Sequence, residues 1–184
     1  MEMKDALRVA ISRVHYPVTS LGQGRRLGIW FQGCSIGCLG CVSPDTWEVK
    51  GDEWIEVQQL VDDCCHFVKE ADGVTISGGE PFEQPEALNS LIKAIRATRD
   101  LHFIVYSGFS FSYLNKMHSK ILGELDVLIS GPYIRGLEKL PLRGSRNQEI
   151  HEINKHRARG GENPDMRLDM SLCQNGEVHL AGIL

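Results

Sequence analysis

Three cysteines occur within eight residues at the spacing C-x3-C-x2-C, at Cys34, Cys38 and Cys41. Three thiolates held this close can cap three corners of a cubane iron–sulfur cluster, which leaves the fourth iron for another ligand. Glycines at positions 33, 37 and 40 let the backbone bend around a compact inorganic group and turn amide N–H groups toward its sulfur atoms. The spacing therefore predicts a cluster-binding loop.

Two other interpretations of these cysteines remain open, a zinc site and plain structural thiols. Structural zinc takes four ligands, usually as two separated pairs, and the sequence has no second pair of that kind. Cys64 and Cys65 are adjacent in a run with helical periodicity, so one of them is expected to face the core. Cys173 lies in a strand-like run and is expected to be structural too. An auxiliary cluster would need three or four convergent thiolates.

A second motif, Ser77-Gly78-Gly79-Glu80-Pro81, follows a short β-branched run. Its two glycines allow a ligand to approach the backbone closely, and Glu80 can pair with an ammonium group. By itself the motif is a weak signal, because a strand-to-helix turn that ends in proline would look similar. Beside a three-cysteine loop it becomes informative.

The elements that must position both motifs are short apolar strands that alternate with amphipathic helices, the pattern of βα units around a parallel sheet. Four of the strands end in a turn that contains glycine, so these turns should meet at the carboxyl rim, where ligands bind in parallel α/β folds. We expect strands at residues 7–14 (an edge strand), 27–31, 73–77, 102–106 and 126–129, and helices at 54–69, from Pro85 onward and near 111–122.

The remaining sequence suggests one domain over residues 1–184, with its core at about 7–133. Residues 136–167 are charged and are expected to form a long loop or a mobile helical segment on the substrate or partner side. The pair Asn175-Gly176 predicts a C-terminal β-hairpin at about 168–182. A complete β/α barrel takes about 250 residues, so a barrel here must be partial.

Composition limits the class of protein. A hydrophobic content of 42% and a charged content of 24% are ordinary for a soluble globular chain. The net charge of −4 argues against a basic nucleic-acid binder. No apolar run approaches the roughly 20 residues of a membrane helix, and no signal peptide is evident. We expect a cytoplasmic protein, because reducing conditions suit an oxygen-sensitive cluster.

Together the two motifs resemble the radical S-adenosylmethionine (SAM) superfamily, in which a C-x3-C-x2-C loop is followed by a Gly-Gly-Glu-Pro turn. Within it, the sequence is most similar to the activating proteins of anaerobic ribonucleotide reductase, which are glycyl-radical-enzyme activases. The resemblance spans about residues 16–150. It is carried by Trp30–Cys34, Cys38–Cys41, Trp47, Ser77–Pro81, Tyr106–Gly108, Asp126–Pro132 and Arg143–Gln148.

The resemblance implies an α/β fold of the radical SAM type, a partial (incomplete) β/α barrel, here with a C-terminal β-hairpin. It also implies roles for individual residues. Cys34, Cys38 and Cys41 would ligate a [4Fe–4S] cluster whose open iron is chelated by SAM. The SAM contacts would come from Gly78, Gly79 and Glu80 at the methionyl ammonium, from Gly40, Cys41 and Val42 at adenine, and from Ser107 at the methionyl carboxylate or ribose. Candidates for substrate contact are Arg143, Arg146, Asn147 and Gln148.

The implied reaction is reductive cleavage of SAM to a 5′-deoxyadenosyl radical, with electrons from a reductant such as a flavodoxin or ferredoxin. The first hypothesis is that this radical generates a glycyl radical on a partner such as anaerobic ribonucleotide reductase. The alternatives are a stand-alone radical SAM enzyme that modifies a nucleoside, nucleotide or peptide, and a non-catalytic iron–sulfur binding module. Activases commonly carry an acidic residue at the position of Ser130, and they often show Asp at the position of Glu80. These two differences leave the identity of the macromolecular substrate open.

Overall fold

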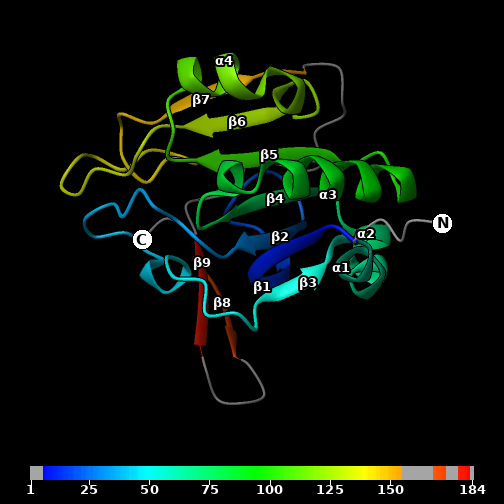
Figure 1. Cartoon of the computed structure of the whole chain (residues 1–184). Coiled ribbons are helices and arrows are strands. Elements are labelled where there is room, and N and C mark those ends of the chain that lie inside the picture. The colour runs from blue at the N-terminus through cyan, green and yellow to red at the C-terminus, as the bar shows by residue number, and fades with distance from the viewer. Residues whose placement is uncertain (1–5, 155–167, 173–177, 183–184) are drawn as a thin grey trace.

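In the computed structural model, which describes residues 6–154 and the backbone of 168–172 and 178–182, the chain forms a mixed seven-stranded sheet (Figure 1). The strand order is β3-β1-β2-β4-β5-β6-β7, in which β2, β4, β5 and β6 are parallel and the flanking strands are antiparallel. The strands are β1 (Arg8–Val18), β2 (Arg26–Phe31), β3 (Trp54–Glu56), β4 (Gly73–Gly78), β5 (His102–Ser107), β6 (Val127–Ser130) and β7 (Glu149–Glu152).

The helices cover one face of this sheet, as Figure 1 shows for α3 and α4. Alternate strand side chains, among them Val74, Ile76, Phe103 and Val105, join the helices in the main hydrophobic core. The helices are α1 (Val57–Asp63), α2 (Cys65–Glu70), α3 (Pro85–Thr98) and α4 (Phe111–Leu122), with short 3₁₀ turns η1 (Pro44–Thr46) and η2 (Pro81–Glu83). None of the helices in the described part of the chain is both long and apolar enough to cross a membrane.

The other side chains of the same strands form smaller clusters on the opposite face. Ile104, Val127 and Ile129 pack with Leu142, and Trp30 packs with Val18 and Leu21. Among the described residues, Leu21 and Leu142 from two loops contribute to the cover of this face. The parallel strands are therefore buried on both faces, as such sheets require.

The glycine-containing turns meet at one rim of the sheet, as predicted. Phe31 lies opposite Gly78 on β4, and Ser107 at the end of β5 lies opposite Ser130 at the end of β6. Parallel registry thus places the cysteine loop, which follows Phe31, next to the glycine turn, which follows β4. The helices predicted from Pro85 and near 111–122 are confirmed as α3 and α4.

The structure differs from the prediction at four points. Residues 54–56 form β3 instead of the first turn of a helix, because they pair with residues 8–10 of β1. That pairing also means that β1 is not the edge strand, and the predicted helix is divided at Cys64. Strand β7 pairs with β6 inside the segment that was predicted to be a loop or helix. Tertiary pairing overrides local preference in such short strands.

At the C-terminus, β8 (Leu168–Leu172) and β9 (Val178–Gly182) pair antiparallel where the hairpin was predicted. The predicted turn, with Asn175 and Gly176, lies outside the described residues, as does Cys173.

A buried arginine crosses three parallel strands at the end of the sheet opposite the glycine turns. Arg26 is 1% exposed. Its guanidinium donates to Thr75 Oγ1 at 2.6 Å, to the carbonyl of Val74 at 2.6 Å and to the carbonyl of His102 at 2.9 Å. Burial lowers its pKa to about 10, so it stays charged at neutral pH.

Replacing this guanidinium should destabilise the whole sheet. Arg26→Met would leave buried carbonyl and hydroxyl acceptors unpaired, so we expect a loss of about 3 kcal/mol in the free energy of unfolding, measured by urea denaturation. The matched control is Arg25→Met, because Arg25 is exposed and its ion pair with Glu70 is long, at 4.0 Å; we expect at most about 1 kcal/mol. Equal losses in both variants would contradict this role of Arg26.

Candidate iron–sulfur and SAM site

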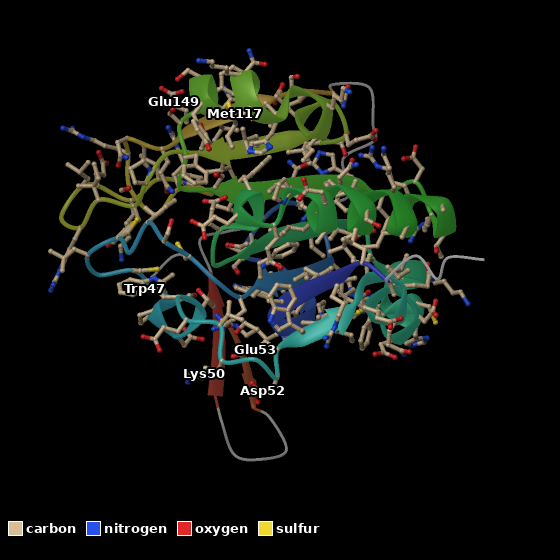
Figure 2. All side chains as sticks on the ribbon, viewed as in Figure 1. Trp47, Lys50, Asp52, Glu53, Met117 and Glu149 are labelled. Carbon is tan, nitrogen blue, oxygen red and sulfur yellow. The ribbon has the colours of Figure 1, made fainter. Side chains whose placement is uncertain are left out.

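The cysteine loop is shaped by glycines and anchored by backbone hydrogen bonds. Gly33, Gly37 and Gly40 have φ of 101°, 58° and 77°, which side-chain-bearing residues rarely adopt. The loop returns at Cys41, whose N–H donates to the carbonyl of Cys38 at 3.0 Å. At its start, the N–H of Cys34 donates to the carbonyl of Trp47, a residue labelled in Figure 2.

The end of the loop is held by an arginine from β1. Arg13 contacts the Asp45 carboxylate at 2.7 Å and the Ser43 hydroxyl at 3.2 Å. The N–H of Ser43 in turn donates to Cys41 Sγ at 3.4 Å. The guanidinium also lies over the ring of Trp30, 5.2 Å from its centroid.

The glycine turn after β4 lies directly against the cysteine loop. The N–H of Gly79 donates to the carbonyl of Phe31 at 2.8 Å, and that of Glu80 donates to the carbonyl of Gly33 at 2.7 Å. A Cβ atom on Gly79 would overlap the Gly33 carbonyl. The two motifs therefore touch through backbone atoms, at a separation that only glycine allows.

The Glu80 carboxylate links this turn to the next one along the rim. Glu80 is 1% exposed and accepts hydrogen bonds from the N–H of Phe82 (3.0 Å), the hydroxyl of Ser107 (2.9 Å) and the N–H of Gly108 (2.8 Å). Burial raises its pKa to about 7, and the three hydrogen bonds oppose that shift. The Ser107 hydroxyl is thus engaged with Glu80 and also accepts from the N–H of Phe109.

The two motifs enclose one cavity of about 340 Å³. Every residue predicted to bind the cluster or SAM lines it: Cys34, Cys38, Gly40, Cys41, Val42, Gly78, Gly79, Glu80 and Ser107. The sequence did not single out Leu21, Ile36, Tyr133 or Lys139, which also line the wall. They come from three loops, since Tyr133 and Lys139 share the loop after β6, and only the fold brings these loops together.

The thiols suit a polynuclear centre. All three are free and half-buried, and burial raises the pKa of Cys34 and of Cys38, so metal binding must displace their protons. Within the described residues, no three His, Cys, Asp or Glu side chains converge on a point that could hold a single metal ion. A cubane cluster does not require three side chains to converge on one point, because each thiolate binds a different iron. This donor set and the glycine cradle fit a [4Fe–4S] cluster.

The residues predicted to contact substrate belong to the loop after β6, and most of them hold that loop together. Gln148 lines the cavity, but its amide accepts from the N–H of Gly144 and donates to the carbonyl of Gly131. Asn147 donates to the carbonyl of Pro132 at 2.8 Å. Arg143 donates to the carbonyl of Gln148, whereas Arg146 is exposed.

The remaining described cysteines behave as predicted. Cys64 is buried and its pKa rises to about 11 through burial, while Cys65 is exposed. One of the two adjacent thiols therefore faces the core.

The sequence is similar to those of known proteins. Residues 20–151 match the family described as "4Fe-4S single cluster domain". The chain is 30% identical over 150 residues to the anaerobic ribonucleoside-triphosphate reductase-activating protein of Haemophilus influenzae, a match that covers 76% of this chain and 96% of that protein. It is 26% identical to the protein of the same name from Enterobacteria phage T4, over 70% of this chain and 85% of that protein.

Two further likenesses are partial. The pyruvate formate-lyase-activating enzyme of Clostridium pasteurianum is 37% identical over 112 residues, which cover 59% of this chain and 45% of that enzyme. The crystal structure of QueE from Escherichia coli aligns with a TM-score of 0.47 at 21% identity, over 56% of this chain and 53% of that one.

The fold and the cavity define an iron–sulfur protein of mixed α/β architecture. More narrowly, the chain belongs to the 4Fe-4S single cluster domain family. Within the radical SAM superfamily, it belongs to the activating proteins of anaerobic ribonucleotide reductase, which its motifs resemble.

A methyl group at Gly79 tests the contact between the two motifs. Because its Cβ would meet backbone that cannot move aside, Gly79→Ala should cost about 3 kcal/mol in the free energy of unfolding and reduce iron uptake on reconstitution. The control is Gly123→Ala, because Gly123 has a φ of −61° and room for a Cβ, and it should be neutral or slightly stabilising. Full iron loading of Gly79→Ala would contradict the close contact.

Glu80 should also make the stability of the cluster-free protein depend on pH. Its folded pKa of about 7 lies above the ordinary 4.5, so the stability it contributes as a neutral acid is complete below about pH 4.5 and lost as pH rises through 7. Urea denaturation between pH 4.5 and 7.5 should show wild type losing on the order of 3 kcal/mol relative to Glu80→Gln. Parallel pH profiles for the two proteins would rule out the raised pKa.

Proposed function

We propose that this protein is a radical SAM activating enzyme that generates a glycyl radical on a partner such as an anaerobic ribonucleotide reductase. The observation that carries the proposal is that three cysteines of one loop and the glycine turn of the next parallel strand line the same cavity. When bound there, a [4Fe–4S] cluster and SAM would supply a 5′-deoxyadenosyl radical that abstracts a hydrogen atom. The names of relatives that the chain matches over 85–96% of their length support this activity.

In this proposal the chain supplies ligands, orientation and a boundary against water. Cys34, Cys38 and Cys41 would hold the cluster as thiolates. Gly78 and Gly79 would let the methionyl ammonium of SAM approach the backbone beside Glu80. A carboxylate has about four acceptor positions, and three at Glu80 are filled by protein donors, so one is left for a ligand cation.

The other proposed SAM contacts come from the end of the cysteine loop and from the end of β5, which both line the cavity. Backbone groups of Gly40, Cys41 and Val42 would contact adenine. Ser107 would contact the methionyl carboxylate or the ribose, and it also acts through Glu80, to which its hydroxyl donates.

The hydrogen donor would approach from the open side of the cavity. A volume of about 340 Å³ lies near the lower end of small-molecule sites, and the proposed cofactors account for most of the wall. Val42, which is 59% exposed, and Lys139 mark where the cavity meets solvent. This supports a loop of a partner protein as the substrate, rather than an enclosed small molecule.

The loop after β6 is the proposed partner side. Arg143, Asn147 and Gln148 would act there by holding the loop in shape. Arg146 is the member of this group most exposed for contact with an acidic partner.

Several further proposals follow from the same family. Four parallel strands with helices on one face are compatible with an incomplete β/α barrel, and we propose a single domain over residues 1–184 with β8 and β9 as a C-terminal hairpin. A flavodoxin or ferredoxin would supply the electron, and the cytoplasm would provide the reducing environment.

The sharpest test compares two cysteines. Cys38→Ala should lose the cluster and at least 100-fold in 5′-deoxyadenosine release from SAM and dithionite, because the remaining two thiolates cannot hold a site-differentiated cubane. Cys65→Ala, an exposed thiol on α2, should retain both. With an anaerobic ribonucleotide reductase as partner, wild type and Cys65→Ala should produce a glycyl radical signal in electron paramagnetic resonance (EPR).

Two outcomes would count against the proposal. A fully loaded wild type that releases no 5′-deoxyadenosine would exclude radical SAM chemistry. Release of 5′-deoxyadenosine without a glycyl radical on any such partner would exclude the activase role.

A further inference from the structure

A second carboxylate of the glycine turn faces the cysteine loop. Glu83 is the last residue of η2, three residues after Glu80. It accepts three hydrogen bonds from Ser35: from the N–H to Oε1 at 3.0 Å and to Oε2 at 3.2 Å, and from the hydroxyl to Oε1 at 2.5 Å. Ser35 directly follows Cys34, so this side chain grips the chain next to the first cluster cysteine.

This contact completes a set of anchors around Cys34. On one side, Gly33 is bonded through its N–H to the carbonyl of Thr46 and through its own carbonyl to the N–H of Glu80. Cys34 itself is bonded through its N–H to the carbonyl of Trp47. On the other side, Glu83 holds Ser35. The turn from Glu80 to Glu83 therefore fixes the residues before and after Cys34.

The charge of Glu83 reaches the cysteine as well. Its carboxylate is hydrogen-bonded to the residue next to Cys34, so a negative charge lies beside any cluster bound to that sulfur. A negative charge at this place disfavours an added electron on the cluster. Glu83 is exposed, so its field is sensitive to salt.

We propose that Glu83 is a positioning residue with two effects. It fixes Cys34 for cluster binding before any metal arrives, and its charge lowers the reduction potential of the bound cluster. The proposal rests on the proposed function only in requiring that a [4Fe–4S] cluster bind at these three cysteines.

Two variants separate the hydrogen bonds from the charge. Glu83→Gln keeps an oxygen that Ser35 can donate to but removes the charge, and Glu83→Ala removes both. The matched control is Glu86→Gln, which removes an exposed carboxylate from the first turn of α3, three residues further on.

The charge effect is measured on the reconstituted protein by an EPR-monitored redox titration at low ionic strength. Glu83→Gln should favour one-electron reduction three- to tenfold, and a tenfold change corresponds to a positive shift of about 59 mV. Glu83→Ala should shift at least as far, because the freed Ser35 donors can then turn toward cluster sulfur. Glu86→Gln should match wild type. A potential in Glu83→Gln equal to that of wild type would overturn the electrostatic effect.

The positioning effect is measured without a cluster, as hydrogen exchange of the Ser35 amide by NMR in the metal-free protein. Exchange should be at least tenfold faster in Glu83→Ala and within about threefold of wild type in Glu83→Gln and Glu86→Gln. An unchanged rate in Glu83→Ala would overturn the positioning effect. If wild type takes up no cluster, the proposed function fails, and the exchange rates still decide whether Glu83 holds the loop.

Discussion

The close approach of two backbone segments, Gly79–Glu80 against Phe31–Gly33, is the contact on which the site depends. The parallel pairing of β2 with β4 delivers both segments to the same rim. Two backbone hydrogen bonds of 2.7–2.8 Å then join them. Because the cysteine loop begins at Gly33, this contact fixes the wall that carries the thiols relative to the wall that carries Glu80.

Buried charges at opposite ends of the sheet are accommodated differently. Arg26 is surrounded by uncharged acceptors that satisfy its guanidinium. Glu80 accepts three hydrogen bonds, yet its pKa still rises to about 7, so burial outweighs the donors it has. A cationic ligand at the cavity wall would favour the ionised form. Binding of such a ligand should therefore be coupled to the release of a proton from Glu80 near neutral pH.

Sequence patterns predicted the parts of this structure that local chemistry determines. The four parallel strands are β-branched or apolar runs that lead into a turn containing glycine. Pro85 marks the start of α3 because proline fits the first helical position. Residue type and spacing alone identified the cysteines and the glycine turn. Strands β3 and β7 escaped prediction because their three or four residues are strands only through pairing with β1 and β6.

The side chains that support the site escaped prediction for a similar reason. Glu83 and Arg13 do not belong to any sequence motif. They support the site because folding brings Glu83 to Ser35 and Arg13 to Asp45. Gln148 has a further role that the sequence did not indicate. It lines the cavity, where contact with substrate is a prediction, and its amide also makes hydrogen bonds to Gly131 and Gly144 within its own loop.

The hydrogen bonds that Gln148 makes within its own loop would affect how the site binds a partner. Glutamine and asparagine amides that bond to their own loop restrict the backbone of residues 131–148 before any partner arrives, so less conformational entropy is lost on association. Tyr133 and Lys139 are then presented at the cavity edge by an ordered loop. The cysteine side is ordered in the same way by Arg13 and Glu83. A site held from both sides by protein contacts can keep its shape while its open face admits a segment of another chain.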